Sequence, residues 1–230
     1  MSNAKDSIAA AIERRYGERL APPALANLDA LAVLNGRSVC RRYKPDPVPD
    51  AVLRLLCATA LAAPTKSDLQ QATLIRVADP AKRLAITSLL PGSPWLAGAP
   101  ELFVFCADGW RFRRLFELRK VAFVNEHLDA FFNATVDAAI ALGAFVGAAE
   151  LAGLGTCPIS QIRDHVARID ALLELPACRS GRYARSPSAR AARSTAPWPR
   201  GSRAQAPPPA PPSREARAGR RSGRRDPGSG

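Results

Sequence analysis

Two arginines are the first residues of this chain whose type and spacing could do chemistry. Arg37 and Arg41 precede a segment in which Pro45, Pro47 and Pro49 hold the backbone extended. A guanidinium is a planar fork of donors that pairs well with a phosphate. These residues alone favour a solvated basic loop, with a phosphate contact as the alternative.

A short turn is the second candidate. Residues 153–155 read Gly-Leu-Gly, a typical signal for the end of a helix. Residues 156–160 follow and contain Pro158, so this turn leaves backbone N–H groups free to point at a ligand. The plain alternative, which the pattern favours, is a helix–turn–strand connection. A polar loop rich in donors, residues 63–70, is a third candidate.

A long apolar run must position these segments. Residues 138–149 are apolar on every face of a helix, with Asp137 and Glu150 at the two ends. Such a helix is typically buried, and this run is shorter than the roughly 20 residues that cross a bilayer. Gly143 and Gly147 share one face and would let another backbone come close. The sequence therefore predicts a central core helix over residues 127–152.

The remaining elements alternate between helices and strands. Helices are expected over residues 7–16, 24–34, 50–62, 80–89, 109–120 and 164–173, and strands over 71–78 and 101–108. The second strand is almost continuously apolar, which predicts burial on both faces. Cys57 falls on the apolar side of its helix and is expected to be a small buried thiol. This order of elements predicts a layered α/β or α+β domain.

The C-terminal part of the chain differs in composition from the rest. The formal charge is +13 over 230 residues, of which residues 177–230 carry +11 and residues 1–176 only +2. Residues 177–230 contain no Leu, Ile, Val, Phe or Met. They are therefore predicted to form a disordered tail behind a domain of residues 1–176. An Arg-rich arm that binds nucleic acid is one alternative. A coding sequence read out of frame, which would give Arg without Lys, is another.

Cysteine and histidine usage narrows the class of protein. Five cysteines are scattered without CxxC spacing, which argues for a reducing compartment and against a disulfide framework or a zinc site. Two histidines are too few for a metal cluster, so no metal is expected. The N-terminus lacks the apolar stretch of a secretion signal, and a cytoplasmic location is expected.

Four motifs in order give the chain a resemblance to the nitroreductase family over residues 30–176. Residues 37–43, RSVCRRY, are similar to R-x-S-x-[RK]-x-[FY], and residues 63–70, APTKSDLQ, are similar to A-P-S-x-x-N-x-Q. Residues 79–108 resemble the helix, loop and strand that follow. Residues 153–163, GLGTCPISQIR, resemble G-L-G-x-x-x-I-G-x-x-R.

The resemblance implies an α+β fold. In this nitroreductase-like three-layer fold, a central mixed or antiparallel sheet is flanked by helices around a long buried helix. It also implies a homodimer with one FMN in each of two interface sites, NAD(P)H as co-substrate, and a nitroaromatic, quinone or related small acceptor. The flavin carries the chemistry, so no catalytic side chain is expected. Cys157 is not expected to be a nucleophile, because no base lies beside it in the sequence.

The resemblance also assigns cofactor-binding residues. Arg37 and Arg41 match contacts to the FMN phosphate and ribityl chain, and Ser93 matches a polar contact to the ring. Val39 stands where the family has Ser, or the register shifts by one and Ser38 takes that place. The loop along the ribityl and ring edge is matched by Pro64, Thr65, Lys66 and Ser67, and the segment facing the isoalloxazine by Cys157, Pro158, Ile159 and Ser160.

Two further departures leave other functions open. Asp68 replaces the usual Asn, and the apolar strand with a basic pair that the family has after its L-x-L-P is absent after Leu173–Pro176. A flavin-binding protein without turnover is therefore the first alternative to an oxidoreductase. A nucleic-acid binder acting through the Arg-rich tail is the second.

Overall fold

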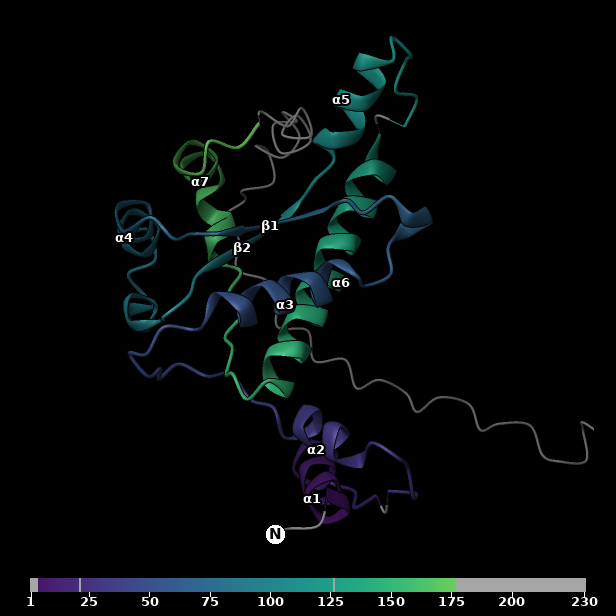
Figure 1. Ribbon diagram of the computed structural model, residues 1–230, viewed down its shortest axis with the longest axis vertical. Helices are drawn as coiled ribbons and strands as arrows, with labels where there is room; N and C mark the ends of the chain where they lie inside the picture. Colours follow the sequence, from purple (N-terminus) through teal and green to yellow (C-terminus); the bar gives the residue numbers. More distant parts are fainter. Residues whose placement is uncertain (1–3, 21, 126, 177–230) are drawn as a thin grey trace, which may run out of the picture. The chain divides into compact units, whose positions relative to one another are not determined.

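The computed structural model describes residues 4–20, 22–125 and 127–176. The chain divides into two units, residues 1–186 and 187–230. Every structural statement below concerns the described part of the first unit, shown in colour in Figure 1. The predicted disordered tail, residues 177–230, lies outside the described residues.

A two-stranded antiparallel sheet forms the middle of the domain. Strand β1 (Ala72–Arg76) pairs with β2 (Phe103–Ala107), and Leu74 lies opposite Phe105 in the register. β-branched and aromatic residues in both segments favour a pleated, half-buried surface. Two backbone bonds of 2.9 Å, from Val77 N–H to the Leu102 carbonyl and from Asp108 N–H to the Gln71 carbonyl, extend the ladder beyond both ends.

One face of the sheet packs against two helices, α3 (Asp50–Leu61) and α6 (Leu128–Leu151). Phe145 of α6 is central to this layer, because its ring centroid lies 5.1 Å from that of Phe103 and 5.4 Å from that of Phe105. Leu56 and Ala60 of α3 complete the buried cluster. Figure 1 shows α3 lying alongside α6 next to the strands.

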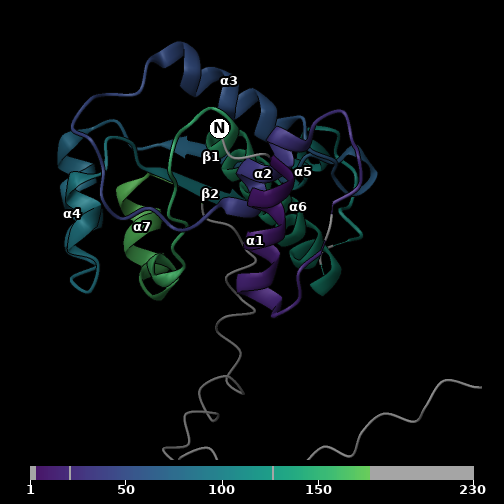
Figure 2. The same cartoon turned by 90° about the horizontal axis from the view of Figure 1, so that it is seen from below.

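The opposite face packs against α4 (Pro80–Ser88) and α7 (Val166–Leu172). Asp79 caps α4 by accepting the N–H groups of Ala81 and Lys82 on its side chain, and Pro80 suits the first turn. Ile86 and Ile169 meet Val77 and Val104 in this layer. Figure 2 shows α4 and α7 side by side, in agreement with their contacts. The predicted α+β three-layer fold is thereby confirmed.

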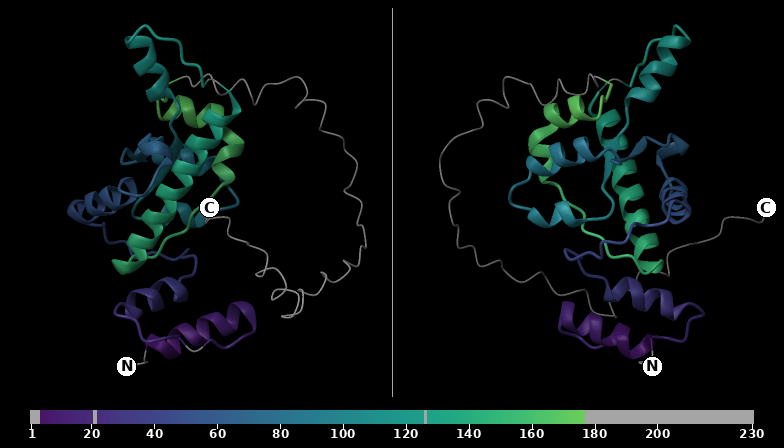
Figure 3. Two further views of the ribbon diagram at one scale, coloured as in Figure 1. Left: turned by 90° about the vertical axis from the view of Figure 1, so that its right-hand side faces the viewer. Right: turned by 60° about the vertical axis from the view of Figure 1, so that its left-hand side comes forward.

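The remaining helices lie outside these layers. Helix α1 (Ala4–Tyr16) packs on α2 (Leu28–Gly36), and α2 contacts α6. Figure 3 shows α1 and α2 as a pair at one end of α6. Helix α5 (Trp110–Leu118) follows β2. Single 3-10 turns are found at Lys66–Asp68, Pro94–Gly98 and Gln161–His165.

Several expected elements differ from the structure. Strand β2 is not buried on both faces, since Val104 alone among its residues is classed as buried. Helix α2 begins at Leu28 rather than at residue 24, because residues 22–25 are non-helical and the helix starts only after Asn27. No strand forms in residues 154–160, and the last predicted helix is split into a 3-10 turn and α7.

The central helix was predicted to within one residue at each end, but it is not buried all round. Phe132 is 55% exposed and Val136 51%, whereas Phe145 is 8% exposed. A Cβ added at Gly147 would lie 3.7 Å from Leu34 Cδ2, and one added at Gly143 would meet open space, so neither glycine is needed for the approach of another backbone. By length and composition alone α6 could cross a membrane, but in this structure it packs on the sheet and α3.

Candidate functional site

The segment that carries the two candidate arginines lies against the turn after α6. Cys40 N–H donates to the Thr156 carbonyl at 2.9 Å, so residues far apart in sequence run side by side. A Cβ at Gly155 would lie 2.7 Å from Cys40 Cβ, closer than two carbon atoms can approach. Glycine is therefore required at position 155 for this close approach.

Arg37 is held by the end of α6. Its Nη2 donates to Thr156 Oγ1 at 3.3 Å, and its Nε lies 3.4 Å from Glu150 Oε1. The second contact is an ion pair without hydrogen-bond geometry, which leaves the buried Nε without a hydrogen-bond partner. Glu150 thus orients a half-buried guanidinium that keeps an unused donor.

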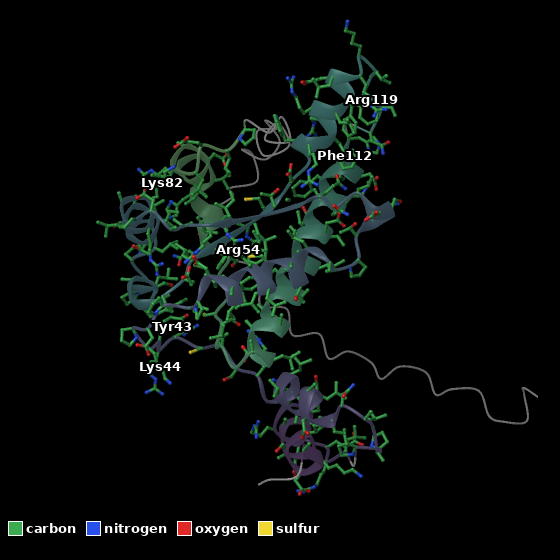
Figure 4. All side chains as sticks on the ribbon, viewed as in Figure 1. Tyr43, Lys44, Arg54, Lys82, Phe112 and Arg119 are labelled. Atoms are coloured by element: carbon green, nitrogen blue, oxygen red, sulfur yellow. The ribbon has the colours of Figure 1, made fainter. Side chains whose placement is uncertain are left out.

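Two aromatic side chains support Arg41. Its guanidinium carbon lies 5.7 Å from the centroid of the Trp95 ring, within cation–π range. The Tyr43 ring centroid is 6.4 Å from that of Trp95, and the Tyr43 hydroxyl donates to the Cys40 carbonyl at 2.7 Å. These contacts bring the loop containing Ser93 beside residues 37–43. Figure 4 labels Tyr43 and its neighbour Lys44 on the loop before α3.

Burial raises the pKa of Tyr43 to about 12, and the nearby thiols Cys157 and Cys40 add to the shift while Arg41 opposes it. The ordinary value is 10.0, so the folded chain holds this proton where the unfolded chain loses it. The free energy of unfolding is therefore expected to fall as pH rises from 10 to about 12. Ultraviolet titration of tyrosinate should show a late step that Tyr43→Phe removes. A Tyr43→Phe profile identical to that of the parent would contradict the assignment.

A large cleft of about 840 Å³ opens beside these residues. Four of the predicted cofactor residues line it, namely Cys157, Pro158, Ile159 and Ser160. Within the described part of the chain, the N–H groups of Cys157, Ile159 and Ser160 donate to no backbone carbonyl. Arg42, Tyr43 and Trp95 also line the cleft. Arg37, Ser38, Val39, Arg41 and Ser93 belong to the adjoining segments without lining it themselves.

The other predicted residues, Pro64–Ser67, lie elsewhere. Their loop is attached to the first half of α6, where Lys66 N–H donates to Asp137 Oδ1 at 3.1 Å. Thr65 and Asp137 line a separate cavity of about 320 Å³. The neighbouring Gln71 side chain has a buried Nε2 without a hydrogen-bond partner.

The structure thus divides the predicted site into two groups. The first group contains Arg37, which pairs with Glu150 at the C-terminal end of α6, and the second group is Pro64–Ser67, which is bonded to Asp137. Glu150 and Asp137 are about 20 Å apart along the helix, at 1.5 Å per residue. The two cavities share no lining residue. In a single copy of the chain, the predicted residues therefore do not converge on one ligand.

Sequence reasoning assigned no role to several residues that hold these groups. Glu150, Tyr43 and Trp95 support the first group, and Asp137 supports the second. The signal for Glu150 and Asp137 was present, since they are the two acids that bound the apolar run of α6. Tyr43 occupies the aromatic position of the motif at residues 37–43, whereas no comparable signal marks Trp95.

The fold and the site define an α+β protein with a cationic segment beside a large cleft. Comparison with known proteins then places the chain: the model of the nitroreductase family matches residues 34–183, and the chain belongs to that family.

This chain matches only part of the length of the known proteins that it resembles. An FMN reductase [NAD(P)H] of Bacillus subtilis is 35% identical over 145 residues, which cover 59% of this chain and 55% of that protein. An oxygen-insensitive NADPH nitroreductase of Salmonella typhimurium is 32% identical, with 64% and 59% covered. The solved NfrA1 nitroreductase of B. subtilis matches with a TM-score of 0.62 at 28% identity, over 64% of this chain and 60% of that one. The chain therefore spans less than two thirds of the length of these relatives.

Proposed function

We propose that this chain is an FMN-dependent oxidoreductase that uses NAD(P)H to reduce a nitroaromatic, a quinone or a related small acceptor. Membership of the nitroreductase family supports the class of reaction, as do relatives named FMN reductase and NADPH nitroreductase. Bound FMN would supply two-electron transfer, and the protein's part would be to bind and orient it. The cytoplasmic location stays a prediction.

The donor set at the cleft fits an anionic cofactor. From the segment adjoining the cleft, Arg41 brings a positive charge, and Arg37, which is ion-paired with Glu150, has a buried Nε without a hydrogen-bond partner. The backbone N–H groups of Cys157, Ile159 and Ser160 donate to no backbone carbonyl of the described residues. Such groups are suited to the phosphate and to the polar ring edge of a flavin. The cleft of about 840 Å³ lies within the size range of cofactor sites.

The division of the site is the observation that carries the proposal, because a second copy of the chain would bring the two groups together. The second group would come from the loop of a partner, which completes each site at an interface. Helix α6 offers the surface for this contact, since an apolar row is exposed along it. The row consists of Leu128 (50% exposed), Phe132 (55%), Val136 (51%) and Ile140 (37%). We therefore propose a homodimer with two sites.

The direct test is the visible spectrum of the purified 230-residue chain after FMN is added and free flavin is removed by desalting. We expect a bound-flavin spectrum, and consumption of NADPH or NADH that depends on an added nitrofuran or quinone. Retained flavin without consumption would replace the oxidoreductase with a flavin-binding protein. A colourless chain would count against the proposed function as a whole.

Two arginine-to-alanine substitutions test whether the first group binds FMN. Arg41→Ala should weaken FMN binding about tenfold or more, because a charge-assisted contact contributes about 1.5–3 kcal/mol. Arg54→Ala is the matched control, since Arg54 is an exposed arginine of α3 that belongs to neither group of predicted cofactor residues. Quenching of FMN fluorescence gives both dissociation constants. Cys157→Ala should leave turnover nearly unchanged. Equal FMN affinity in the two arginine variants would remove Arg41 from the site.

A further inference from the structure

A buried carboxylate in the first half of α6 holds the loop of the second group. Asp137 is fully buried, with 0% of its surface exposed. Its Oδ1 accepts the N–H of Lys66 at 3.1 Å, and its Oδ2 accepts the N–H of Gln71 at 3.0 Å. Each oxygen therefore binds one end of the same six-residue stretch, and β1 begins directly after it.

The stretch between these two bonds is strained. Ser67, Asp68 and Gln70 all have positive φ, at 51°, 54° and 50°, although none is glycine. Backbone of this kind persists only where the surroundings impose it. Other hydrogen bonds of residues 66–70 are local, such as Gln70 N–H to Thr65 Oγ1 at 3.2 Å, while the Gln71 carbonyl accepts Asp108 N–H at 2.9 Å beside the sheet. Asp137 ties this stretch to α6.

We propose that Asp137 is a positioning residue for the cofactor: its two carboxylate oxygens clamp residues 66–71, so that the neighbouring Pro64–Ser67 are held in the conformation that binds FMN. This inference rests on the proposed function. Asp137 does not itself touch the flavin in this scheme. It acts through the loop, and replacing it should change flavin affinity without unfolding the domain.

The geometry supplies a matched control. Asp79 also accepts two backbone N–H groups, from Ala81 and Lys82, but it does so with the single oxygen Oδ1 at 2.7 and 3.2 Å. An asparagine has one acceptor oxygen, so Asp79→Asn can keep both bonds. Asp137→Asn keeps one bond and turns an amide N–H donor toward the other backbone donor. Asp137→Asn should therefore release the loop, whereas Asp79→Asn should leave its helix cap unchanged.

The first readout is amide hydrogen exchange in the chain without flavin. Asp137→Asn should speed exchange at Lys66 or Gln71 about tenfold or more, since a net hydrogen bond corresponds to roughly that factor. Exchange in α3 and β2 should stay at the parent rate, and Asp79→Asn should match the parent throughout. Unchanged exchange at both amides would overturn the clamp, and faster exchange across the whole domain would make Asp137 merely structural.

The second readout is FMN titration of the same proteins by fluorescence quenching. Asp137→Asn should weaken binding several-fold while Asp79→Asn does not. If the parent binds FMN and Asp137→Asn binds it equally well, the positioning role is wrong even where the loop has loosened. If the parent binds no FMN, the proposed function fails and the positioning role fails with it. The exchange data then still decide whether the clamp exists.

A loop variant covers the case in which Asp137→Asn does not fold. Lys66→Pro removes one clamped N–H from an exposed position, and Thr65 already has the extended ψ of 160° that a following proline requires. Lys66→Ala removes the same side chain but keeps the N–H. The inference expects weaker FMN binding in Lys66→Pro than in Lys66→Ala, and equal binding would contradict it.

Discussion

Mixing two flavin-deficient variants of this chain is expected to restore flavin binding. Arg41→Glu reverses a charge in the first group, and Lys66→Glu reverses one in the second. Each variant alone should lose FMN, because every site of the proposed homodimer would combine one damaged half with one intact half. Both changes are at exposed side chains, so the fold should survive.

The expected recovery has a definite size. In a symmetric dimer each site takes one group from each chain, so a mixed dimer has one site with both halves intact and one with both damaged. Random exchange of subunits makes half of the dimers mixed, and about a quarter of all sites should therefore bind FMN. Absorbance of retained flavin after joint unfolding and refolding measures this fraction.

A third chain provides the control. A variant that carries both Arg41→Glu and Lys66→Glu has no intact half to contribute, so mixing it with either single variant should restore nothing. Recovery in that control would show that the refolding procedure, rather than complementation, retains the flavin. Failure of the two single variants to complement would contradict a site shared between two chains, and both groups would then have to act within one.

Local signals were enough to predict most helices. Helix α6 was placed to within one residue at each end, because Gly153–Gly155 mark its end, and the structure adds that His127 caps its start. Helix α4 begins at Pro80 as expected, and the structure adds the Asp79 cap. The start of α2 was missed, since Ala24 and Leu25 favour a helix locally while the chain there stays non-helical.

The layout of the site could not be predicted in the same way. The ion pair of Arg37 with Glu150 and the bond of Cys40 to Thr156 join residues more than a hundred positions apart, and no local pattern encodes them. The strained loop contains no glycine at its positive-φ positions, so nothing in its composition marked the conformation. Contacts between residues distant in sequence determine both the position of Arg37 and the conformation of this loop.

The burial of α6 could be predicted from its apolar pattern only in part. An apolar residue on every face predicts contact on every face, but it does not say which chain provides the contact. Phe145 meets Phe103 and Phe105 of the same chain, whereas Phe132 is 55% exposed in it. The sequence pattern of a core helix and that of a helix shared between two copies are the same.

Two phenylalanines of α6 should therefore differ sharply in their contribution to stability. Phe145→Ala is expected to lower the free energy of unfolding by about 3–5 kcal/mol, the usual cost of removing a buried aromatic ring and leaving a cavity. Phe145 is 8% exposed and packs edge-on against Phe105. A domain of this size is stable by only about 5–15 kcal/mol, so the variant should be close to unfolding at 25 °C or below.

The matched substitution on the other side of the helix is Phe132→Ala. In a single chain it should cost little, because more than half of that side chain is already in solvent. Urea unfolding at several protein concentrations separates the two effects, since dimer dissociation depends on concentration and folding of one chain does not. Phe145→Ala should lower the midpoint at every concentration, and Phe132→Ala should lower it mainly where the parent is dimeric. Equal losses at low concentration would mean that Phe132 is buried within one chain, and α6 would then have no free face to offer a second copy.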